Sequence, residues 1–147
     1  MTAADSAHQE PSHTSAQPRF LALVRGGALA GAIAAVGTIA VAAVARAVDV
    51  SLEVDATPIP IPAFGLWTVV GAALGVLMAR LLVARRRFLV VAIVATGLSL
   101  IPPIALPDEA ATKAVLVAAH LLAASIIIPI LGRGLTTVDA NAGTRDR

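Results

Sequence analysis

The residue best suited to chemistry in this sequence is His120, an ionisable side chain deep inside a long apolar run. It lies seven residues after Lys113, which in a helix places it about 10 Å from the start of that run. Ser99, Thr68 and Thr38 lie at a similar depth in three other apolar runs. The four side chains therefore predict a small polar site inside an apolar interior, with His120 as a proton acceptor or ligand contact.

The same residues also have a structural interpretation. A neutral His120 could hydrogen-bond to Ser99 across a tightly packed helix pair. Ser and Thr in apolar helices usually donate to the carbonyl of the preceding turn. The sequence alone leaves the functional and the structural interpretation of His120 open.

The sequence predicts no catalytic residue, no metal site and no cofactor. Every Asp and Glu lies outside the apolar runs, no G-x-S-x-G or H-E-x-x-H motif occurs, and there is no cysteine. His8 and His13 are too few to bind a metal ion. We therefore expect a protein that is not an enzyme.

The composition predicts a membrane protein. Of 147 residues, 58% are hydrophobic and 14% are charged, whereas soluble domains carry about 25% charged residues. Ten of the eleven basic residues are arginine, and no basic patch is interleaved with aromatic residues, which argues against nucleic-acid binding. The expected environment is the lipid bilayer.

The apolar runs predict four spanning helices. The predicted spans are residues 22–47, 63–84, 88–106 and 113–131, between polar tails at 1–18 and 134–147. The residues between Arg25 and Arg46 number 20, enough at 1.5 Å each for a core of about 30 Å. A cleavable signal peptide is the alternative interpretation of this run. However, the run is longer than the apolar region of a signal peptide, which has about 7–15 residues.

Two of the predicted spans carry residues that disfavour a helix. Pro102 and Pro103 disfavour helical backbone at Ile101 and Pro102, so the third span is expected to end or kink near Leu100. Gly132-Arg133-Gly134 is expected to end the fourth span.

Arginines predict the orientation of the bundle. Arg85, Arg86 and Arg87 lie between the second and third spans, where positive charge is typical of a cytoplasmic loop. Counting spans outward from this loop places nine basic residues inside and two outside, and puts both termini in the cytoplasm. The inside set is Arg19, Arg25, Arg80, Arg85, Arg86, Arg87, Arg133, Arg145 and Arg147, and the outside set is Arg46 and Lys113.

Residues 48–61, the outer segment, combine acidic residues with prolines. Polar and apolar residues alternate over Asp49–Asp55, which predicts extended backbone. We interpret the segment as a stiff, exposed ribbon and as the best candidate surface for a protein partner. Phe64 and Trp67, which follow it, are expected in the aromatic belt at the outer interface.

Glycines four residues apart predict close helix packing. Gly27 and Gly31 form one such pair and Gly71 and Gly75 another. Glycine pairs let two backbones approach in lipid. We favour packing between the first two spans of one chain, while a homo-oligomer contact is left open.

Several stretches resemble a known family. These are Arg25-Gly26-Gly27-Ala28-Leu29, Arg86-Arg87-Phe88-Leu89-Val90-Val91-Ala92, and Ala119-His120-Leu121-Leu122-Ala123-Ala124 with Ile128-Pro129. Over about residues 20–133 the chain resembles an actinobacterial family of small four-span membrane proteins, catalogued as a domain of unknown function. The resemblance implies a membrane fold and no activity.

The predicted fold is all-α: a four-helix antiparallel transmembrane bundle with both termini cytoplasmic. The first functional hypothesis is a non-enzymatic, multi-pass plasma-membrane protein that acts by packing or partner binding. The alternative is a small carrier or channel with a polar intramembrane site around His120.

Overall fold

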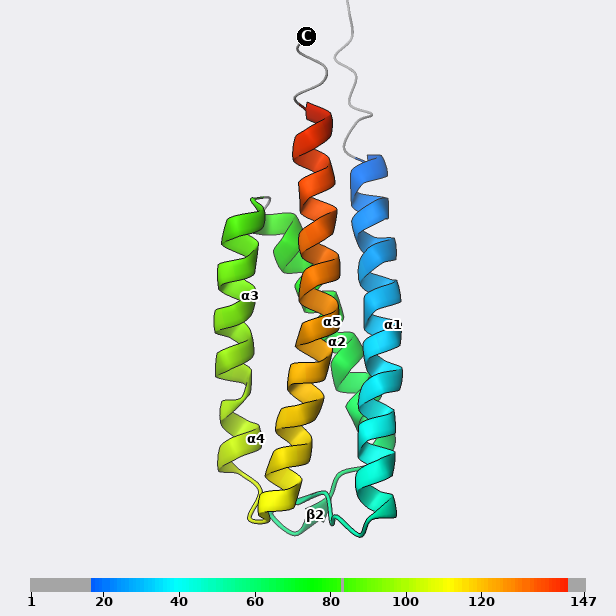
Figure 1. Ribbon diagram of the computed structural model, residues 1–147, viewed down its shortest axis with the longest axis vertical. Helices are drawn as coiled ribbons and strands as arrows, with labels where there is room; N and C mark the ends of the chain where they lie inside the picture. The colour runs from blue at the N-terminus through cyan, green and yellow to red at the C-terminus, as the bar shows by residue number, and fades with distance from the viewer. Residues whose placement is uncertain (1–16, 83, 143–147) are drawn as a thin grey trace, which may run out of the picture.

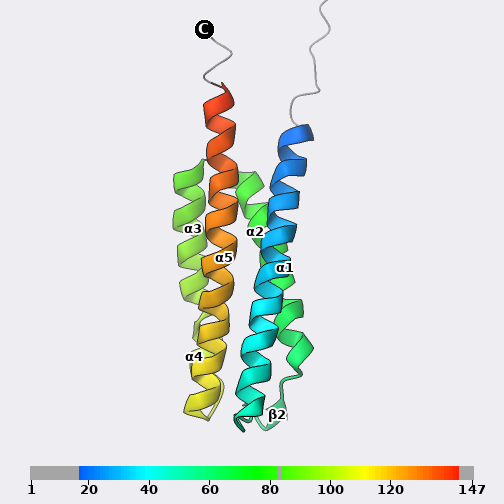
Figure 2. The same cartoon turned by 45° about the vertical axis from the view of Figure 1, so that its right-hand side comes forward.

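The structure is a computed structural model that describes residues 17–82 and 84–142. Its long helices are α1 Gln17–Ala47, α2 Ile61–Leu82, α3 Arg85–Ser99 and α5 Ala110–Ala142, which run up and down beside one another (Figures 1 and 2). Four helical stretches are long and apolar enough to cross a membrane: Phe20–Ala47, Ile61–Leu82, Arg85–Ala105 and Ala110–Leu135. The predicted all-α bundle of four apolar helices is confirmed. Of the predicted N-terminal tail, residues 1–16 lie outside the described residues.

The third span bends where the prolines predicted an interruption. α3 ends at Ser99, and the short helix α4, Ile101–Ala105, follows after Leu100. The prediction that Ile101 and Pro102 avoid helical backbone is wrong. The prolines occupy the first turn of α4, where a missing N–H costs no hydrogen bond and the fixed φ suits a helix.

The C-terminal helix is longer than predicted. α5 continues through Gly132 and Gly134 to Ala142, so the expected end at these glycines is wrong. A glycine inside a helix costs only about 1 kcal/mol relative to alanine. Both glycines also allow close packing, because an added Cβ would lie 3.4 Å from Leu89 Cδ2 at Gly132 and 3.3 Å from Leu23 Cδ1 at Gly134. Residues 143–147 of the predicted tail lie outside the described residues.

The first helix ends in a Schellman motif. The Val50 N–H donates to the Ala45 carbonyl at 3.0 Å, and the Asp49 N–H donates to the Arg46 carbonyl at 3.2 Å. Asp49 has a φ of 60°, the left-handed backbone that this motif requires. The motif terminates α1 and turns the chain into the outer segment.

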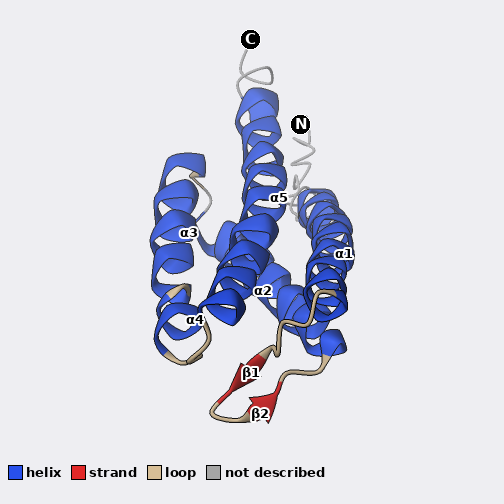
Figure 3. Cartoon of the chain, turned by 60° about the horizontal axis from the view of Figure 1, so that its bottom comes forward, coloured by secondary structure: helices blue, strands red, loops and turns tan. Residues whose placement is uncertain are grey.

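The outer segment contains a small hairpin (Figure 3). β1, Glu53–Val54, pairs antiparallel with β2, Thr57–Pro58. Asp55 and Ala56 form the turn and both have positive φ, the pattern of a type I′ hairpin. Of the predicted extended stretch Asp49–Asp55, only Glu53–Val54 is a strand.

The outer segment is anchored to the bundle rather than fully exposed. The Leu52 side chain is completely buried. Ser51 Oγ donates to Glu109 Oε2 at 2.6 Å, and Arg46 Nη2 donates to the Ile59 carbonyl at 3.4 Å. The prediction of an exposed ribbon is therefore wrong for these anchored residues. Leu52 packs into a buried apolar cluster, and Ser51 and Ile59 hydrogen-bond to residues at the ends of the long helices.

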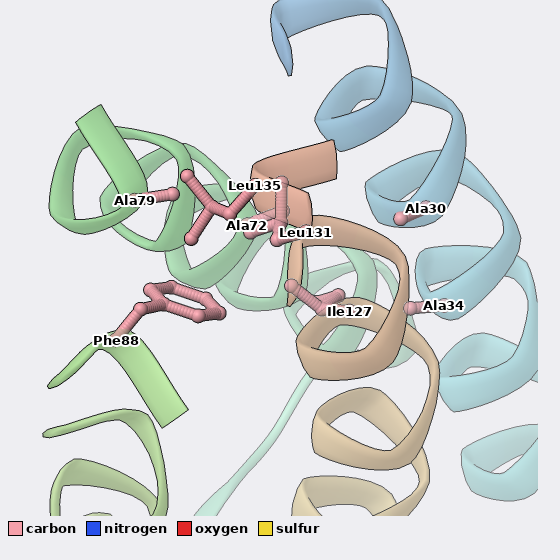
Figure 4. Close-up of a cluster of buried hydrophobic side chains, with 8 residues drawn as sticks. All are labelled: Ala30, Ala34, Ala72, Ala79, Phe88, Ile127, Leu131 and Leu135. Atoms are coloured by element: carbon pink, nitrogen blue, oxygen red, sulfur yellow. The ribbon is translucent and has the colours of Figure 1, made fainter. Parts of the chain in front are cut away.

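Two clusters of buried apolar side chains hold the helices together. The inner cluster, drawn in Figure 4, consists of Ala30, Ala34, Ala72, Ala79, Phe88, Ile127, Leu131 and Leu135. The Phe88 ring points from α3 into the space between α2 and α5 (Figure 4). Phe88 is the buried side chain of α3, so this helix is anchored at the end that carries Arg85.

The outer cluster closes the other end of the bundle and consists of Ala42, Ala45, Leu52, Phe64 and Ala119. The prediction that Phe64 belongs to an aromatic belt is wrong, because its side chain lies in this cluster. Trp67, the other belt candidate, is 70% exposed.

Three of the four glycines predicted to pack do so within the chain. A Cβ added at Gly27 would collide with Val76, and one at Gly31 would lie 2.8 Å from Ala72 Cβ, both on α2. Gly75 also packs within the chain, but it faces Leu131 of α5, so the favoured contact between the first two spans is wrong for this glycine. Gly71 is different, since an added Cβ would meet no described atom within 4 Å; the packing role predicted for it is wrong within the chain.

Candidate functional site

A cavity of about 800 Å³ lies between α2, α3 and α5. We call it the slot. It extends from Ala63 to Met78 along α2 and from Leu116 to Leu131 along α5, while Phe88–Ser99 of α3 forms its third side. Figure 3 shows why α1 is not a main wall: α1 and α3 lie on opposite sides of the bundle, with α2 and α5 between them.

The slot is elongated and open along one side. The 15 steps along the helix from Leu116 to Leu131 correspond to about 22 Å, most of a hydrocarbon core of about 30 Å. Wall residues on α2 and α3 stay exposed, including Leu74 at 56% and Val91 at 37%. The inner cluster residues Phe88 and Leu131 line its inner end. The slot is therefore open to the outside of the bundle between α2 and α3.

The four residues of the predicted polar site, His120, Ser99, Thr68 and Thr38, all line the slot. Their predicted common level rests on similar distances from the ends of the predicted spans. In the structure Ser99 is the last residue of α3, whereas Thr38, Thr68 and His120 lie inside their helices. Their assignment as a binding site stays a prediction.

Thr38 and Thr68 join α1 to α2. Their hydroxyl oxygens are 3.0 Å apart, and both hydroxyls approach the Phe64 carbonyl, at 3.3 Å from Thr38 and 2.7 Å from Thr68. Thr38 is also 3.1 Å from the Ala35 carbonyl and is 2% exposed. The pair links the two helices at the edge of the slot.

His120 and Ser99 bond within their own helices. His120 Nδ1 lies 2.9 Å from the Leu116 carbonyl, and Ser99 Oγ donates to the Thr96 carbonyl at 2.8 Å. The His120–Ser99 hydrogen bond of the structural interpretation is therefore not formed. The half-buried His120 ring keeps its second nitrogen, Nε2, for another partner.

A second polar cluster lies outside the slot, at the start of α5. Glu109 Oε2 accepts hydrogen bonds from Ser51 Oγ and from Thr112 Oγ1, the latter at 2.8 Å. These bonds, that from Ser51 above all, lower the pKa of the Glu109 carboxyl below its ordinary value of 4.5. Glu109 thus anchors the outer segment instead of turning inward toward His120. The available sequence signal for this cluster was the three-residue spacing of Glu109 and Thr112, which brings two side chains together on one helix face.

The arginines of the predicted topology lie at one end of the bundle. Arg85, Arg86 and Arg87 are exposed at the α2–α3 turn, at the same end as the start of α1 and the end of α5 (Figure 1). The Arg80 guanidinium lies over the Phe20 ring, 4.5 Å from its centroid. This cation–π contact joins the last turn of α2 to the start of α1.

Sequence reasoning missed the apolar walls of the slot. Gly71 was assigned to helix packing, but it lines the slot and leaves space there. Phe88 at its inner end was seen only as the start of a span. No three His, Cys, Asp or Glu side chains gather to hold a metal ion among the residues that the structure describes.

The sequence profile of a family described as "Family of unknown function (DUF6069)" matches residues 18–137. The chain belongs to this family. The match covers all four apolar helices and the slot between them. No curated protein and no solved structure matches the chain. The restriction of the family to actinobacteria stays a prediction.

Proposed function

We propose that this protein is a non-enzymatic, multi-pass protein of the plasma membrane that binds a small, largely apolar molecule in the slot. The observation that carries the proposal is the slot itself: about 800 Å³, within the range of about 300–1,000 Å³ typical of ligand sites. A helix bundle that served only as a scaffold would be expected to fill this space with side chains.

The composition of the slot favours a ligand with a long apolar part. Most of its lining is Ala, Val, Leu, Ile, Phe and Met, while polar side chains gather near the outer end. A molecule with one polar group and an apolar body would match both parts. Its route would be lateral, from the bilayer, because the exposed wall residues lie between α2 and α3.

The absence of reactive groups in the slot supports a binding role over catalysis. Its described lining contains no carboxylate, amine or thiol, and His120 has no acid beside it there. Nucleophilic and acid–base mechanisms generally need a second group to activate or orient the first.

The proposal can be tested with a photoactivatable long-chain alcohol and the protein in lipid nanodiscs. Wild-type protein should be labelled at slot residues of α3, and unlabelled alcohol should compete. Gly71→Leu should lose most of this competable labelling, because the side chain enters open space within the slot.

Gly97→Leu is the matched control. Gly97 is also an exposed helical glycine with no described atom within 4 Å of an added Cβ, but it does not line the slot. Its labelling should equal that of the wild type. Labelling that is not competed, or that survives in Gly71→Leu, would refute the binding proposal.

We also propose that both ends of the chain lie in the cytoplasm. Support comes from the exposed Arg85, Arg86 and Arg87 at the end where α1 begins and α5 ends. The chain has no cysteine, so single-cysteine variants report cleanly. An impermeant maleimide applied to intact cells should label Asp55→Cys and spare Arg86→Cys; the reverse pattern would invert the topology.

Partner binding at the outer segment is the second candidate function. It is favoured by the exposed acidic side chains Glu53 and Asp55 at the hairpin. If the slot binds no apolar probe, this candidate becomes the better explanation.

A further inference from the structure

The hydroxyl groups and the imidazole of the slot share one property: their protons are already directed to acceptors within the protein. The remaining polar side chain of the described lining is Trp67, whose indole N–H is a donor on a side chain that is 70% exposed. Thr68 Oγ1 donates to the Phe64 carbonyl at 2.7 Å, Thr96 Oγ1 to the Ala92 carbonyl at 2.8 Å, and Ser99 Oγ to the Thr96 carbonyl at 2.8 Å. A carbonyl oxygen can only accept, so the hydroxyl must be the donor in each pair. Each hydroxyl oxygen then presents lone pairs alone to a ligand.

The proton of Thr38 is also used within the protein. Its oxygen lies within hydrogen-bond distance of the carbonyls of Ala35 and Phe64 and of the Thr68 hydroxyl. The Thr68 proton is directed to the Phe64 carbonyl, so the Thr38 hydroxyl has three acceptors for one proton.

His120 follows the same rule. Its Nδ1 faces the Leu116 carbonyl at 2.9 Å, which requires the proton on Nδ1. In the neutral ring Nε2 then carries a lone pair and acts as an acceptor. A ligand that needed a donor from His120 would require either the loss of this bond or a charged ring within the apolar slot.

The slot also lacks fixed charge. Its described lining contains no Lys or Arg that could pair with an anionic headgroup, and no Asp or Glu that could pair with an ammonium group. An unpaired ion in such surroundings is strongly unfavourable.

We infer that the slot selects a neutral hydrogen-bond donor, a long-chain alcohol, over anionic, cationic and acceptor-only lipids. This inference rests on the binding function proposed above and adds the chemical class of the ligand. The hydroxyl would donate to one of the lone pairs near the outer end, with His120 Nε2 the strongest acceptor. The hydrocarbon chain would lie along the wall toward Phe88.

Competition in nanodiscs tests the inference without altering the protein. The competitors against the photoactivatable alcohol are a long-chain alcohol, its methyl ether, the fatty acid of equal length and the matching amine, at neutral pH. The ether keeps the shape but cannot donate, so it should compete roughly 3- to 10-fold less well than the alcohol, the value of one hydrogen bond. The acid and the amine should compete at least about 10-fold less well.

A variant then locates the acceptor. In His120→Phe the alcohol and the ether should compete almost equally well against the photoactivatable alcohol, so that the ratio of their potencies approaches one. Ser125→Ala is the control, since Ser125 lies one turn further along α5 and does not line the slot; its preference should be unchanged.

The outcomes separate the two proposals. If no competitor displaces the probe, the binding function fails and the inference fails with it. If the ether matches the alcohol, or the acid or amine competes best, the binding function stands and the inference is overturned. A preference for alcohol that persists in His120→Phe would overturn the assignment of Nε2 as the acceptor.

Discussion

The contact between α1 and α2 at Gly31 gives the sharpest test of the fold. A Cβ added there would lie 2.8 Å from the Ala72 Cβ, whereas ordinary contact begins at 3.4 Å. Gly31→Ala therefore requires the helices to separate by at least 0.6 Å, the difference between these two distances. Because both atoms belong to short, rigid side chains, no rotamer change can relieve the clash.

The expected cost follows from two opposing effects. Overpacking a well-packed contact destabilises a fold by about 1–3 kcal/mol. Replacing a helical glycine by alanine stabilises the helix by up to about 1 kcal/mol. Gly71→Ala is the control, because it has the same propensity gain in the interior of α2 and no described atom within 4 Å of the new Cβ. Gly31→Ala should thus be less stable than Gly71→Ala by about 1–3 kcal/mol.

Reversible unfolding in detergent micelles measures this difference. The double variant Gly31→Ala/Ala72→Gly removes the facing methyl group, so its loss should be smaller than the sum of the two single losses. Additive losses, or a Gly31→Ala protein as stable as Gly71→Ala, would refute the close contact. If Gly31→Ala abolished only a cross-linkable dimer, the glycines would pack between chains instead.

Three further predictions concern the outer end of the bundle. Leu52→Ala should lower the free energy of unfolding by about 2–5 kcal/mol, measured by thermal denaturation, whereas the exposed Leu66→Ala should change it little. Ala56→Gly should raise stability by up to about 1 kcal/mol, because glycine relieves the φ of 57° in the hairpin turn; a loss of stability would contradict the turn. The pKa of Glu109 is lowered, so its carboxylate stabilises the fold above pH 4.5, and this contribution is lost as the pH falls through the lowered pKa. Glu109→Gln should therefore be less stable than wild type at neutral pH and equally stable in acid; a gap that does not change with pH in unfolding scans would contradict this.

Local sequence features determined the spans and their interruptions. Long apolar runs with few charged residues define four helices because only satisfied backbone is stable in hydrocarbon. Pro102 and Pro103 marked the bend near Leu100, since they remove N–H groups whatever surrounds them. Similar distances from the ends of the predicted spans also predicted one level for His120, Ser99, Thr68 and Thr38, because the rise per residue is constant.

The tertiary structure alone decided how these helices face one another. In a membrane, apolar residues cover nearly all sides of a helix, so the sequence does not indicate which side meets a neighbour. Gly31 and Gly71 look alike in the sequence, yet one contacts Ala72 and the other borders open space. The slot and the anchoring of Leu52 arise from contacts between residues far apart in the chain, which local spacing does not determine.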